Sequence, residues 1–323
     1  MEIVCMSHKE DVDGIVSAAL VKAAFNATTI ILSDYPSLIP RLERLAERKI
    51  GKLFVCDLGL SKRNEEKFAE ILGRIAKDAD VTYIDHHDIS PAIKKALKKS
   101  GVKLVHTIKE CTSVQVYSKY KAKLPAHAAF LAAMGALTDY MEAKPKAKLL
   151  VPRYDRQFLM LEATATSYMI SASQKDDEFL FRIVDTLSRM KYPHDVKEGF
   201  ERAEKYARKV ANAVDTIQGS IVTLQNLAHA PSTVDLSSSM VVNFVLGSSG
   251  KPAAMVYKLK EDIGSYVVSI RGSKKCKVHL GRLVNEITTE LGGSGGGHDK
   301  ASGAVVPKAR LDEFIKILDS KIA

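Results

Sequence analysis

Acidic and imidazole side chains follow several short apolar segments of this 323-residue chain. The clearest case is Val81–Ile84, a run of strand-forming residues that leads directly into Asp85, His86 and His87. Such a run is typical of a buried parallel strand that ends in a polar loop. Asp-His-His alone is a weak signal, and it gains weight because other segments of the chain end in the same way.

Two more predicted strands, over residues 2–7 and 52–56, lead into acids or histidines, and an Ala-rich helix predicted over 125–137 leads into an acid. Since the carboxyl ends of parallel strands meet at one edge of a sheet, we expect these groups to gather there. An acid at the end of so apolar a helix is rarely without a partner. The residues expected at this edge are His8, Asp11, Asp13, Asp57, Asp85, His86 and His87, with Asp139 closing the group.

Several carboxylates at one sheet edge repel one another and cannot all stay ionised without cations nearby. Carboxylate and imidazole ligands without thiolate suit Mn²⁺ best, with Mg²⁺ or Co²⁺ as alternatives. Two ions about 3.5–4 Å apart can share a carboxylate, polarise a bridging water into a nucleophile and neutralise oxygens around phosphorus. The competing interpretation, in which each acid caps a helix or faces solvent, fits one acid better than the whole set. The pattern therefore predicts a two-metal site.

A glycine-rich stretch, residues 292–303, lies between a predicted helix and a predicted strand. As a linker it would have no function, but a linker is not needed inside a domain. Glycines let backbone N–H groups face an anion, so we interpret the stretch as a phosphate-binding nest. It is not a P-loop, because no Gly-Lys-Ser/Thr follows. His298 and Ser302 would add donors, and Arg271, after a predicted strand, would add charge or stack on a base.

Composition gives broader limits. With 46% hydrophobic and 27% charged residues, the chain is typical of a globular protein. No apolar run is long enough to span a bilayer and no signal-peptide pattern opens the chain, so we expect a cytoplasmic protein without membrane association. The net charge of +10 suits a polyanionic partner such as nucleic acid, although solvated lysines explain it equally well. The four scattered cysteines indicate reduced thiols, not a zinc site or a disulfide framework.

Strands and helices alternate from residue 2 to about 106, which predicts an α/β fold with a parallel sheet. A helical middle follows, with long helices expected over 156–190 and 194–218 on either side of Pro193. The C-terminal part changes to several strands with turns between them. Strands are expected over 220–227, 241–246, 253–259, 266–270 and 304–306, and helices over 278–291 and 311–322.

Together these segments resemble the DHH phosphoesterase family, which includes nanoRNases and RecJ-like nucleases, with its C-terminal DHHA1 domain. The resemblance implies a parallel-sheet DHH metal-binding domain over 1–145, a helical connector over 146–218 and a smaller α/β DHHA1 domain with a mixed sheet over 219–323. The four DHH motifs correspond to His8 with Asp11–Gly14, to Asp57, to Asp85–His87 and to Asp139, and the DHHA1 signature to residues 295–303 preceded by Ser269–Arg271.

The resemblance also implies roles. One ion is held by His8, Asp11 and Asp57, and the other by Asp13, Asp57, His86 and Asp139, so that Asp57 bridges the two ions. Asp85 orients a histidine, and His87 touches the scissile phosphate or the leaving oxygen. The terminal nucleotide of the substrate is held by Arg271, Gly296, Gly297, His298 and Ser302.

This chain departs from many bacterial nanoRNases at two points. Two residues instead of three separate His8 from Asp11, and Asp139 is followed by Tyr-Met where those enzymes have Thr-Gly. These departures put the bacterial substrate preference in doubt, not the metal centre.

The expected activity is that of a Mn²⁺-dependent exonuclease that uses a two-metal-activated hydroxide to release 5′-mononucleotides from short or single-stranded RNA or DNA. The helical middle favours the archaeal Hef-associated nuclease type, which implies 3′–5′ polarity and a DNA-repair helicase as candidate partner; a homo-oligomer stays open. The alternative is a phosphodiesterase for cyclic dinucleotides or a phosphatase for 3′-phosphoadenosine 5′-phosphate. A non-enzymatic nucleic-acid-binding module is disfavoured because every motif keeps its ligands.

Overall fold

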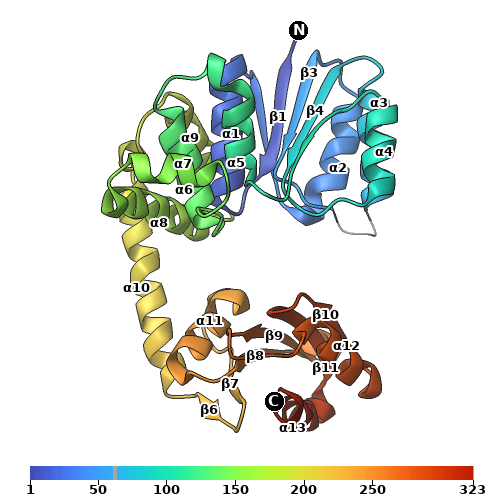
Figure 1. Cartoon of the computed structure of the whole chain (residues 1–323), viewed down its shortest axis with the longest axis vertical. Coiled ribbons are helices and arrows are strands. Elements are labelled where there is room, and N and C mark those ends of the chain that lie inside the picture. Colours follow the sequence, from blue (N-terminus) through green and yellow to red (C-terminus); the bar gives the residue numbers. More distant parts are fainter. Residues whose placement is uncertain (61–63, 323) are drawn as a thin grey trace. The chain divides into compact units, whose positions relative to one another are not determined.

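The computed structural model describes residues 1–60 and 64–322. The chain divides into two compact units, Met1–Ala207 and Arg208–Ala323, here called unit 1 and unit 2. Each unit has its own sheet and its own hydrophobic clusters (Figure 1). No helix among the described residues is both long and apolar enough to cross a membrane.

Unit 1 is built on a five-stranded sheet in the order β2-β1-β3-β4-β5. Every neighbouring pair is parallel, which confirms the sheet predicted from the alternating pattern. Because all five strands are parallel, their carboxyl ends lie at the same edge of the sheet. The strands are β1 (Ile3–His8), β2 (Thr29–Ser33), β3 (Lys52–Cys56), β4 (Asp80–Asp85) and β5 (Lys103–His106).

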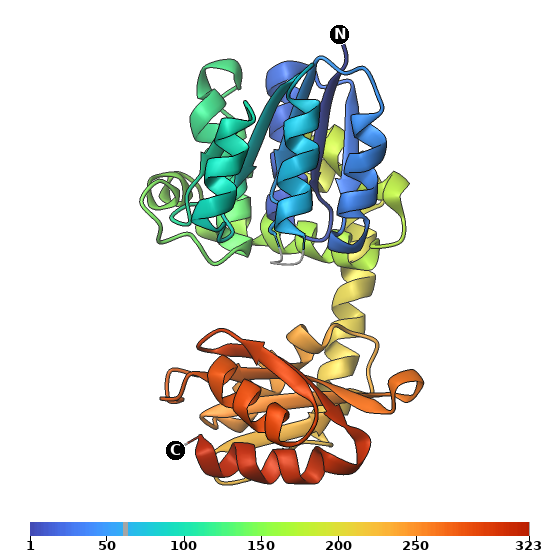
Figure 2. The same cartoon turned by 90° about the vertical axis from the view of Figure 1, so that its right-hand side faces the viewer.

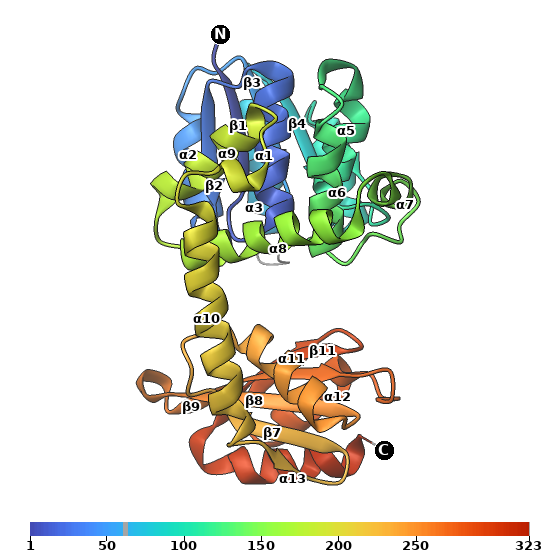
Figure 3. The ribbon, with the colours of Figure 1, turned by 90° about the vertical axis from the view of Figure 1, so that its left-hand side faces the viewer.

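Helices cover both faces of this sheet, so its strands are apolar on both sides. In β1, Val4 and Met6 pack toward the helices of one face and Cys5 toward those of the other. Figure 2 shows the first face, and Figure 3 shows the opposite one. The first face carries α2 (Tyr35–Ala46), α3 (Glu65–Ile75) and α4 (Pro91–Lys99); the second carries α1 (Val12–Phe25), α5 (Thr112–Tyr120) and α6 (Ala128–Thr138). The sequence over 63–77 is typical of a charged helix, and its expected start, Arg63, lies outside the described residues.

The helical middle consists of α7 (Ala147–Leu150), α8 (Arg156–Ala172), α9 (Asp177–Ser188) and α10 (Gly199–Gln218). The single helix expected over 156–190 is wrong, because residues 173–176 interrupt it. Asp176 caps α9 by accepting a hydrogen bond from the Phe179 N–H at 3.0 Å, a start signal inside a helical pattern. Helices α8 and α9 pack in the same core as α1 and α6, and α10 crosses the division between the units. The three-domain division stays a prediction.

Unit 2 has a six-stranded mixed sheet in the order β10-β11-β9-β8-β7-β6. Only β7 and β8 run parallel; the other neighbouring pairs are antiparallel. Helices α12 and α13 pack on one face and α11 on the other. The elements are β6 (Val222–Thr223), β7 (Leu227–Pro231), α11 (Ser238–Ser249), β8 (Ala253–Lys260), β9 (Ser265–Gly272), α12 (Leu280–Glu290), β10 (Ser294–Gly297), β11 (Ala301–Pro307) and α13 (Leu311–Lys321).

The strand expected over 241–246 is helix α11 instead. Its β-branched valines favour a strand locally, but Ser237 caps the helix start and Gly250, at φ 62°, ends it. Val241, Val242 and Val245 are fully buried at helical spacing. Caps and burial therefore override the local propensity.

The phosphate-binding nest expected in the glycine-rich stretch is also wrong as a backbone conformation. Ser294–Gly297 forms the edge strand β10, paired antiparallel with β11. The glycines are explained largely by packing: a Cβ on Gly295 would lie 2.8 Å from Val284 of α12. A Cβ on Gly281 of α12 would lie 2.1 Å from the Gly297 carbonyl oxygen. Helix α12 therefore rests almost directly on the backbone of β10.

A buried acid ties α8 to the segment before α10. Glu162 is 1% exposed, and its carboxylate accepts the His194 N–H at 3.1 Å and contacts His194 Nδ1 at 2.5 Å. We expect Glu162→Ala to lower the free energy of unfolding by about 2 kcal/mol, because it removes both contacts and leaves a cavity. Urea titration followed by circular dichroism measures the change. The control Glu313→Ala, at an exposed ion pair with Arg310, should change it by less than about 0.5 kcal/mol; equal effects would contradict the assignment.

Candidate metal centre

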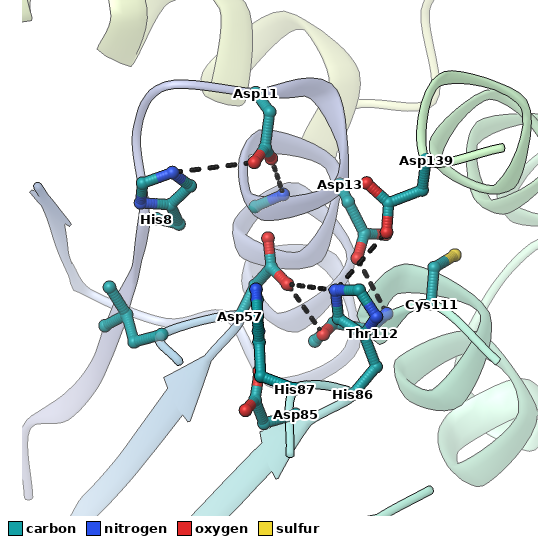
Figure 4. A network of polar contacts seen from close by, with 12 residues as sticks. His8, Asp11, Asp13, Asp57, Asp85, His86, His87, Cys111, Thr112 and Asp139 are labelled. Carbon is teal, nitrogen blue, oxygen red and sulfur yellow. Dashed lines mark hydrogen bonds and ion pairs between the residues drawn. The ribbon is translucent and has the colours of Figure 1, made fainter. Parts of the chain in front are cut away.

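The acids and histidines expected at the sheet edge of unit 1 do lie there, at the ends of β1, β3 and β4 (Figure 4). His8 and Asp85 are the last residues of β1 and β4, and Asp57 follows β3 directly. Asp11 caps α1, with its carboxylate accepting the Gly14 N–H at 2.9 Å. Helices α5 and α6 complete the group, α5 with its first turn and α6 with Asp139 as its final cap.

Asp13, in the first turn of α1, is held by the start of α5. Its two carboxylate oxygens accept the backbone N–H groups of Thr112 at 2.7 Å and Ser113 at 2.9 Å, from 99 and 100 residues away. These N–H groups lack partners within their own helix, and the helix dipole favours a negative charge there. The sequence Cys111–Tyr117 is typical of a capped helix start, in which Thr or Ser side chains satisfy the unpaired N–H groups, but α5 has no side-chain cap of its own. Asp13 therefore takes over the capping.

Asp57 is 1% exposed and adopts φ 57°, a left-handed conformation that is uncommon outside glycine. Its carboxylate accepts the Thr112 hydroxyl at 2.9 Å. Burial raises the pKa of Asp57 well above its ordinary value, and the charges of Asp13 and Asp11 raise it further. A buried acid of this kind requires either a proton or a cation.

His86 lies between two of the acids. Its Nε2 atom is 3.4 Å from an oxygen of Asp57 and 3.3 Å from an oxygen of Asp139. Burial, together with the charge of Asp13, raises the pKa of Asp139 to about 7. The Asp139 oxygen facing His86 is buried and makes no hydrogen bond with any described residue. This orphaned oxygen is the ligand atom that a bound cation would satisfy.

His87 is oriented by a fully buried acid. Its Nδ1 atom lies 2.9 Å from Asp85, which also accepts the Tyr83 hydroxyl at 3.0 Å. Burial lowers the pKa of His87, but the hydrogen bond and charge of Asp85 outweigh it, so the net shift is upward. A Cβ on Gly59 would lie 2.7 Å from the His87 ring, so only glycine leaves room for this ring.

His8 and Asp11 form a separate pair, with His8 Nε2 3.5 Å from Asp11. The His8 ring packs against Tyr35 at 4.9 Å between centroids. His8 is 4% exposed, and its Nδ1 has no hydrogen-bond partner within the described chain.

Among the residues that the structure describes, two groups of side chains offer ligand atoms within 4.8 Å of one another: Asp13, His86 and Asp139, and Asp57, His86 and His87. His86 belongs to both groups. Oxygen and nitrogen donors, the orphaned Asp139 oxygen and the upward pKa shifts of buried acids all fit divalent cations. His8 and Asp11 belong to neither group, and His87 belongs to the group that contains Asp57. The ligand sets expected from the sequence stay a proposal.

The residues expected to bind substrate lie in unit 2, on three neighbouring strands and, for His298, in the turn between β10 and β11. Arg271 of β9 pairs with Ala301 of β11, and Ser302 of β11 pairs with Gly297 of β10. The Arg271 guanidinium donates to the Ser239 hydroxyl at 2.7 Å. The Ser302 hydroxyl donates to the Gly296 carbonyl at 2.7 Å, and the His298 N–H donates to the Ala301 carbonyl, also at 2.7 Å.

Sequence reasoning missed most of the residues that hold the ligands in place. Gln115 is buried, and its side-chain nitrogen lies 2.9–3.1 Å from the carbonyl oxygens of Asp85, Thr107 and Glu110. Tyr83 lies two residues before Asp85 on β4, so both side chains point to the same face of the sheet, and this contact could have been predicted from the sequence. Gln115, like Tyr35 beside His8, carried no local signal, because its role depends on contacts distant in sequence.

Two protein-family models match this chain, one in each unit. Residues 2–137 match the model of the DHH family, N-terminal domain, and residues 230–323 match that of the DHHA1 domain. The uncharacterized protein MJ0831 of Methanocaldococcus jannaschii is 27% identical over 180 residues, which are 54% of this chain. The chain spans only 38% of the length of that curated relative.

Solved structures share the fold at low sequence identity. PggH from Vibrio cholerae, a pGpG-specific phosphodiesterase, is 13% identical with a TM-score of 0.64, and the match covers 99% of both chains. RecJ from Thermus thermophilus, in complex with Mn²⁺, is 15% identical with a TM-score of 0.63, covering 99% of this chain and 51% of RecJ. The DHH domain of PF0399 has a TM-score of 0.70 at 14% identity, covering 99% of this chain and 86% of that one.

Unit 1 thus combines a parallel sheet with acids and histidines at its carboxyl edge that could hold a metal ion, and a mixed-sheet unit follows it along the chain. Residues 2–137 form an N-terminal domain of the DHH family, and residues 230–323 form a DHHA1 domain.

Gly135 tests how closely α6 must approach Asp13. A Cβ there would lie 2.2 Å from the Ser113 hydroxyl and 2.8 Å from an Asp13 oxygen. We expect Gly135→Ala to displace Asp13 and to weaken Mn²⁺ binding, measured by calorimetry, by about 10-fold or more. Gly247→Ala, in α11 where a Cβ meets no atom within 4 Å, is the control. Unchanged affinity in Gly135→Ala would show that Asp13 is not a ligand.

The raised pKa values of Asp139 and Asp57 predict that the stability of the metal-free protein falls as pH rises toward neutral. Asp139 titrates near 7 when folded, against an ordinary value of 3.8, so the folded state binds this proton more tightly. The resulting stability is fully present below the ordinary pKa and is lost as pH rises through about 7. Thermal unfolding in a chelator should give a higher Tm at pH 5 than at pH 8. Mn²⁺ at pH 8 should restore it, whereas a flat profile in the chelator would contradict the burial of these charges.

Proposed function

We propose that this chain hydrolyses phosphodiester bonds in short or single-stranded nucleic acid, with Mn²⁺ as the preferred ion. One observation carries the proposal: His86 lies within about 3.4 Å of both Asp57 and Asp139, which joins the two ligand groups into one centre. Such a centre, with ligands from separate strand ends, is suited to phosphoryl chemistry. RecJ, whose fold this chain shares, is solved in complexes with Mn²⁺ and with Mg²⁺, which supports divalent ions at this centre.

The proposed ligands are Asp13, Asp57, His86 and Asp139 for one ion and His8, Asp11 and Asp57 for the other. Bound divalent ions supply Lewis-acid stabilisation of oxygens at phosphorus and lower the pKa of coordinated water. Asp57 is central in this scheme because its carboxylate is buried between the ligand groups. Its left-handed backbone and its bond from Thr112 fix the carboxylate before an ion arrives.

His87 has a separate proposed role at the substrate. Asp85 holds Nδ1, which leaves Nε2 as the nitrogen available to other groups. The upward shift of its pKa keeps His87 protonated to higher pH than an ordinary histidine. His87 is therefore suited to donate a hydrogen bond, or a proton, to the leaving oxygen.

Unit 2 is proposed to bind the terminal nucleotide. Arg271 is partly buried, and desolvation lowers its pKa from the ordinary value; such a guanidinium binds a phosphate or stacks on a base. A Cβ on Gly296 would meet no atom nearer than 4.0 Å, so packing does not require glycine there. Gly296, with Gly297, His298 and Ser302 beside it, is proposed to let the substrate approach the backbone closely.

A linear dinucleotide is the second candidate substrate. The structural match with PggH, a pGpG-specific phosphodiesterase, covers 99% of both chains. The same metal centre serves both reactions. Release of 5′-mononucleotides, 3′–5′ polarity, a helicase partner, assembly into a homo-oligomer and a cytoplasmic location stay predictions, as do activity on cyclic dinucleotides and on 3′-phosphoadenosine 5′-phosphate.

Asp57→Asn tests the proposal directly. The purified protein, with Mn²⁺, is incubated with a labelled single-stranded 20-mer, a linear dinucleotide and a cyclic dinucleotide. We expect the wild type to cut the first two, and the variant to lose about 10³-fold or more of kcat, because the central carboxylate loses its charge. The control Glu313→Ala should match the wild type. Full activity in Asp57→Asn would contradict the metal assignment, and cleavage of the cyclic substrate alone would contradict the substrate class.

A further inference from the structure

Tyr140 follows the proposed ligand Asp139 and is 88% exposed. Its backbone adopts φ 56°, a conformation that costs free energy for a residue with a bulky side chain. The turn is fixed on both sides, because the Tyr140 N–H donates to the Leu137 carbonyl at 3.2 Å and the Met141 N–H to the Ala136 carbonyl at 2.8 Å. The fold therefore holds an aromatic ring in solvent one residue from the metal centre.

Three lysines follow within eight residues. Lys144, Lys146 and Lys148 are all exposed, with Glu142 as the one acid in this stretch. None of the three ammonium groups forms an ion pair with a carboxylate of the described residues, whereas Lys9, Lys22 and Lys52 elsewhere in unit 1 do. At about 3.3–3.6 Å per residue, Lys144 lies at most about 14 Å along the chain from Tyr140.

A buried acid fixes the lysine segment. Glu110 is 3% exposed, and its two carboxylate oxygens accept the backbone N–H groups of Lys146 at 2.6 Å and Ala147 at 3.2 Å. Glu110 immediately precedes the start of α5, whose Thr112 contacts both Asp13 and Asp57. The segment is thus joined to the metal centre through two short connections, by Asp139–Tyr140 at one end and by Glu110–Thr112 at the other.

We propose that Tyr140 and the three lysines bind the part of a single-stranded nucleic acid that extends beyond the scissile phosphate. Tyr140 stacks on the base next to the metal centre, and Lys144, Lys146 and Lys148 contact successive phosphates beyond it. This inference rests on the proposed function and names its substrate: a strand longer than a dinucleotide. A linear dinucleotide without terminal phosphates, the form used in the test below, reaches Tyr140 but has no phosphate for the lysines.

The physical basis is an aromatic platform combined with a cationic track. Stacking of a base on an aromatic ring contributes about 1–3 kcal/mol and tolerates any base sequence. Each lysine that neutralises a phosphate of a single strand adds about 0.7 to the slope of log affinity against log salt. Unpaired lysines suit this role because no intramolecular ion pair has to be broken on binding.

The test compares two triple variants of equal charge. Lys144→Gln/Lys146→Gln/Lys148→Gln removes the track, and Lys95→Gln/Lys98→Gln/Lys99→Gln removes three exposed lysines of α4, on the other face of the sheet (Figure 1). Affinity for a labelled single-stranded 20-mer is measured by fluorescence anisotropy in a chelator over a range of salt concentrations. We expect the track variant to lower the salt slope by about 2 and the control variant to leave it unchanged.

Measurements of kcat/KM with Mn²⁺ distinguish the role of the three lysines from the role of Tyr140. The track variant should lose about 10-fold or more in kcat/KM on the 20-mer and stay within about twofold of the wild type on a dinucleotide. Tyr140→Ala should lose about 10-fold on both substrates, and Tyr140→Phe should restore the rate, since it keeps the ring.

Equal salt slopes for the two triple variants, or a track variant that is impaired equally on both substrates, would overturn the inference while the proposed function stands. If the wild type cuts neither substrate, the proposed function fails, and the anisotropy measurement still decides whether this segment binds a strand.

Discussion

The buried carboxylates at the strand ends of unit 1 repel one another, and the arrangement of that unit depends on holding them together. Asp57 is nearly inaccessible to solvent, and burial raises its pKa, as it does that of Asp139. Such groups lower the stability of the metal-free fold at neutral pH. The unit tolerates this cost because the parallel sheet and its helices are buried in two large cores. A stable frame can thus carry a locally unfavourable site.

The first turn of α5 stabilises the buried carboxylates of Asp13 and Asp57. Its backbone N–H groups bind both oxygens of Asp13, and its Thr112 hydroxyl binds Asp57. A helix start is favourable for anions because its N–H groups are unpaired and its dipole end is positive. Gly135 then lets α6 approach the same carboxylate. Segments near residues 13, 57, 112 and 135 therefore converge through short polar contacts, not through apolar packing alone.

Much of this could be predicted from the sequence. The alternation of strands and helices predicted the parallel sheet, and the acids that follow its strands predicted the position of the site, because strand ends in such sheets share an edge. The supporting residues could not be predicted this way. Gln115 and Tyr35 act through contacts whose partners are distant in sequence. The valines of α11 were misassigned because local propensity favours a strand, whereas burial and capping decide the helix.

The glycine-rich stretch shows why composition alone cannot separate packing from binding. Gly293, Gly295 and Gly297 each leave less than 3 Å for an added Cβ, so strand pairing and the close approach of α12 account for them. Gly296 faces open space and is explained by neither. Its strand neighbour Gly303 also has room for a Cβ, which would lie at an ordinary contact distance of 3.6 Å from the Val268 carbonyl oxygen. Two paired glycines without a packing role leave a flat, accessible part of the sheet near Arg271, and this surface is where a ligand-based explanation is needed.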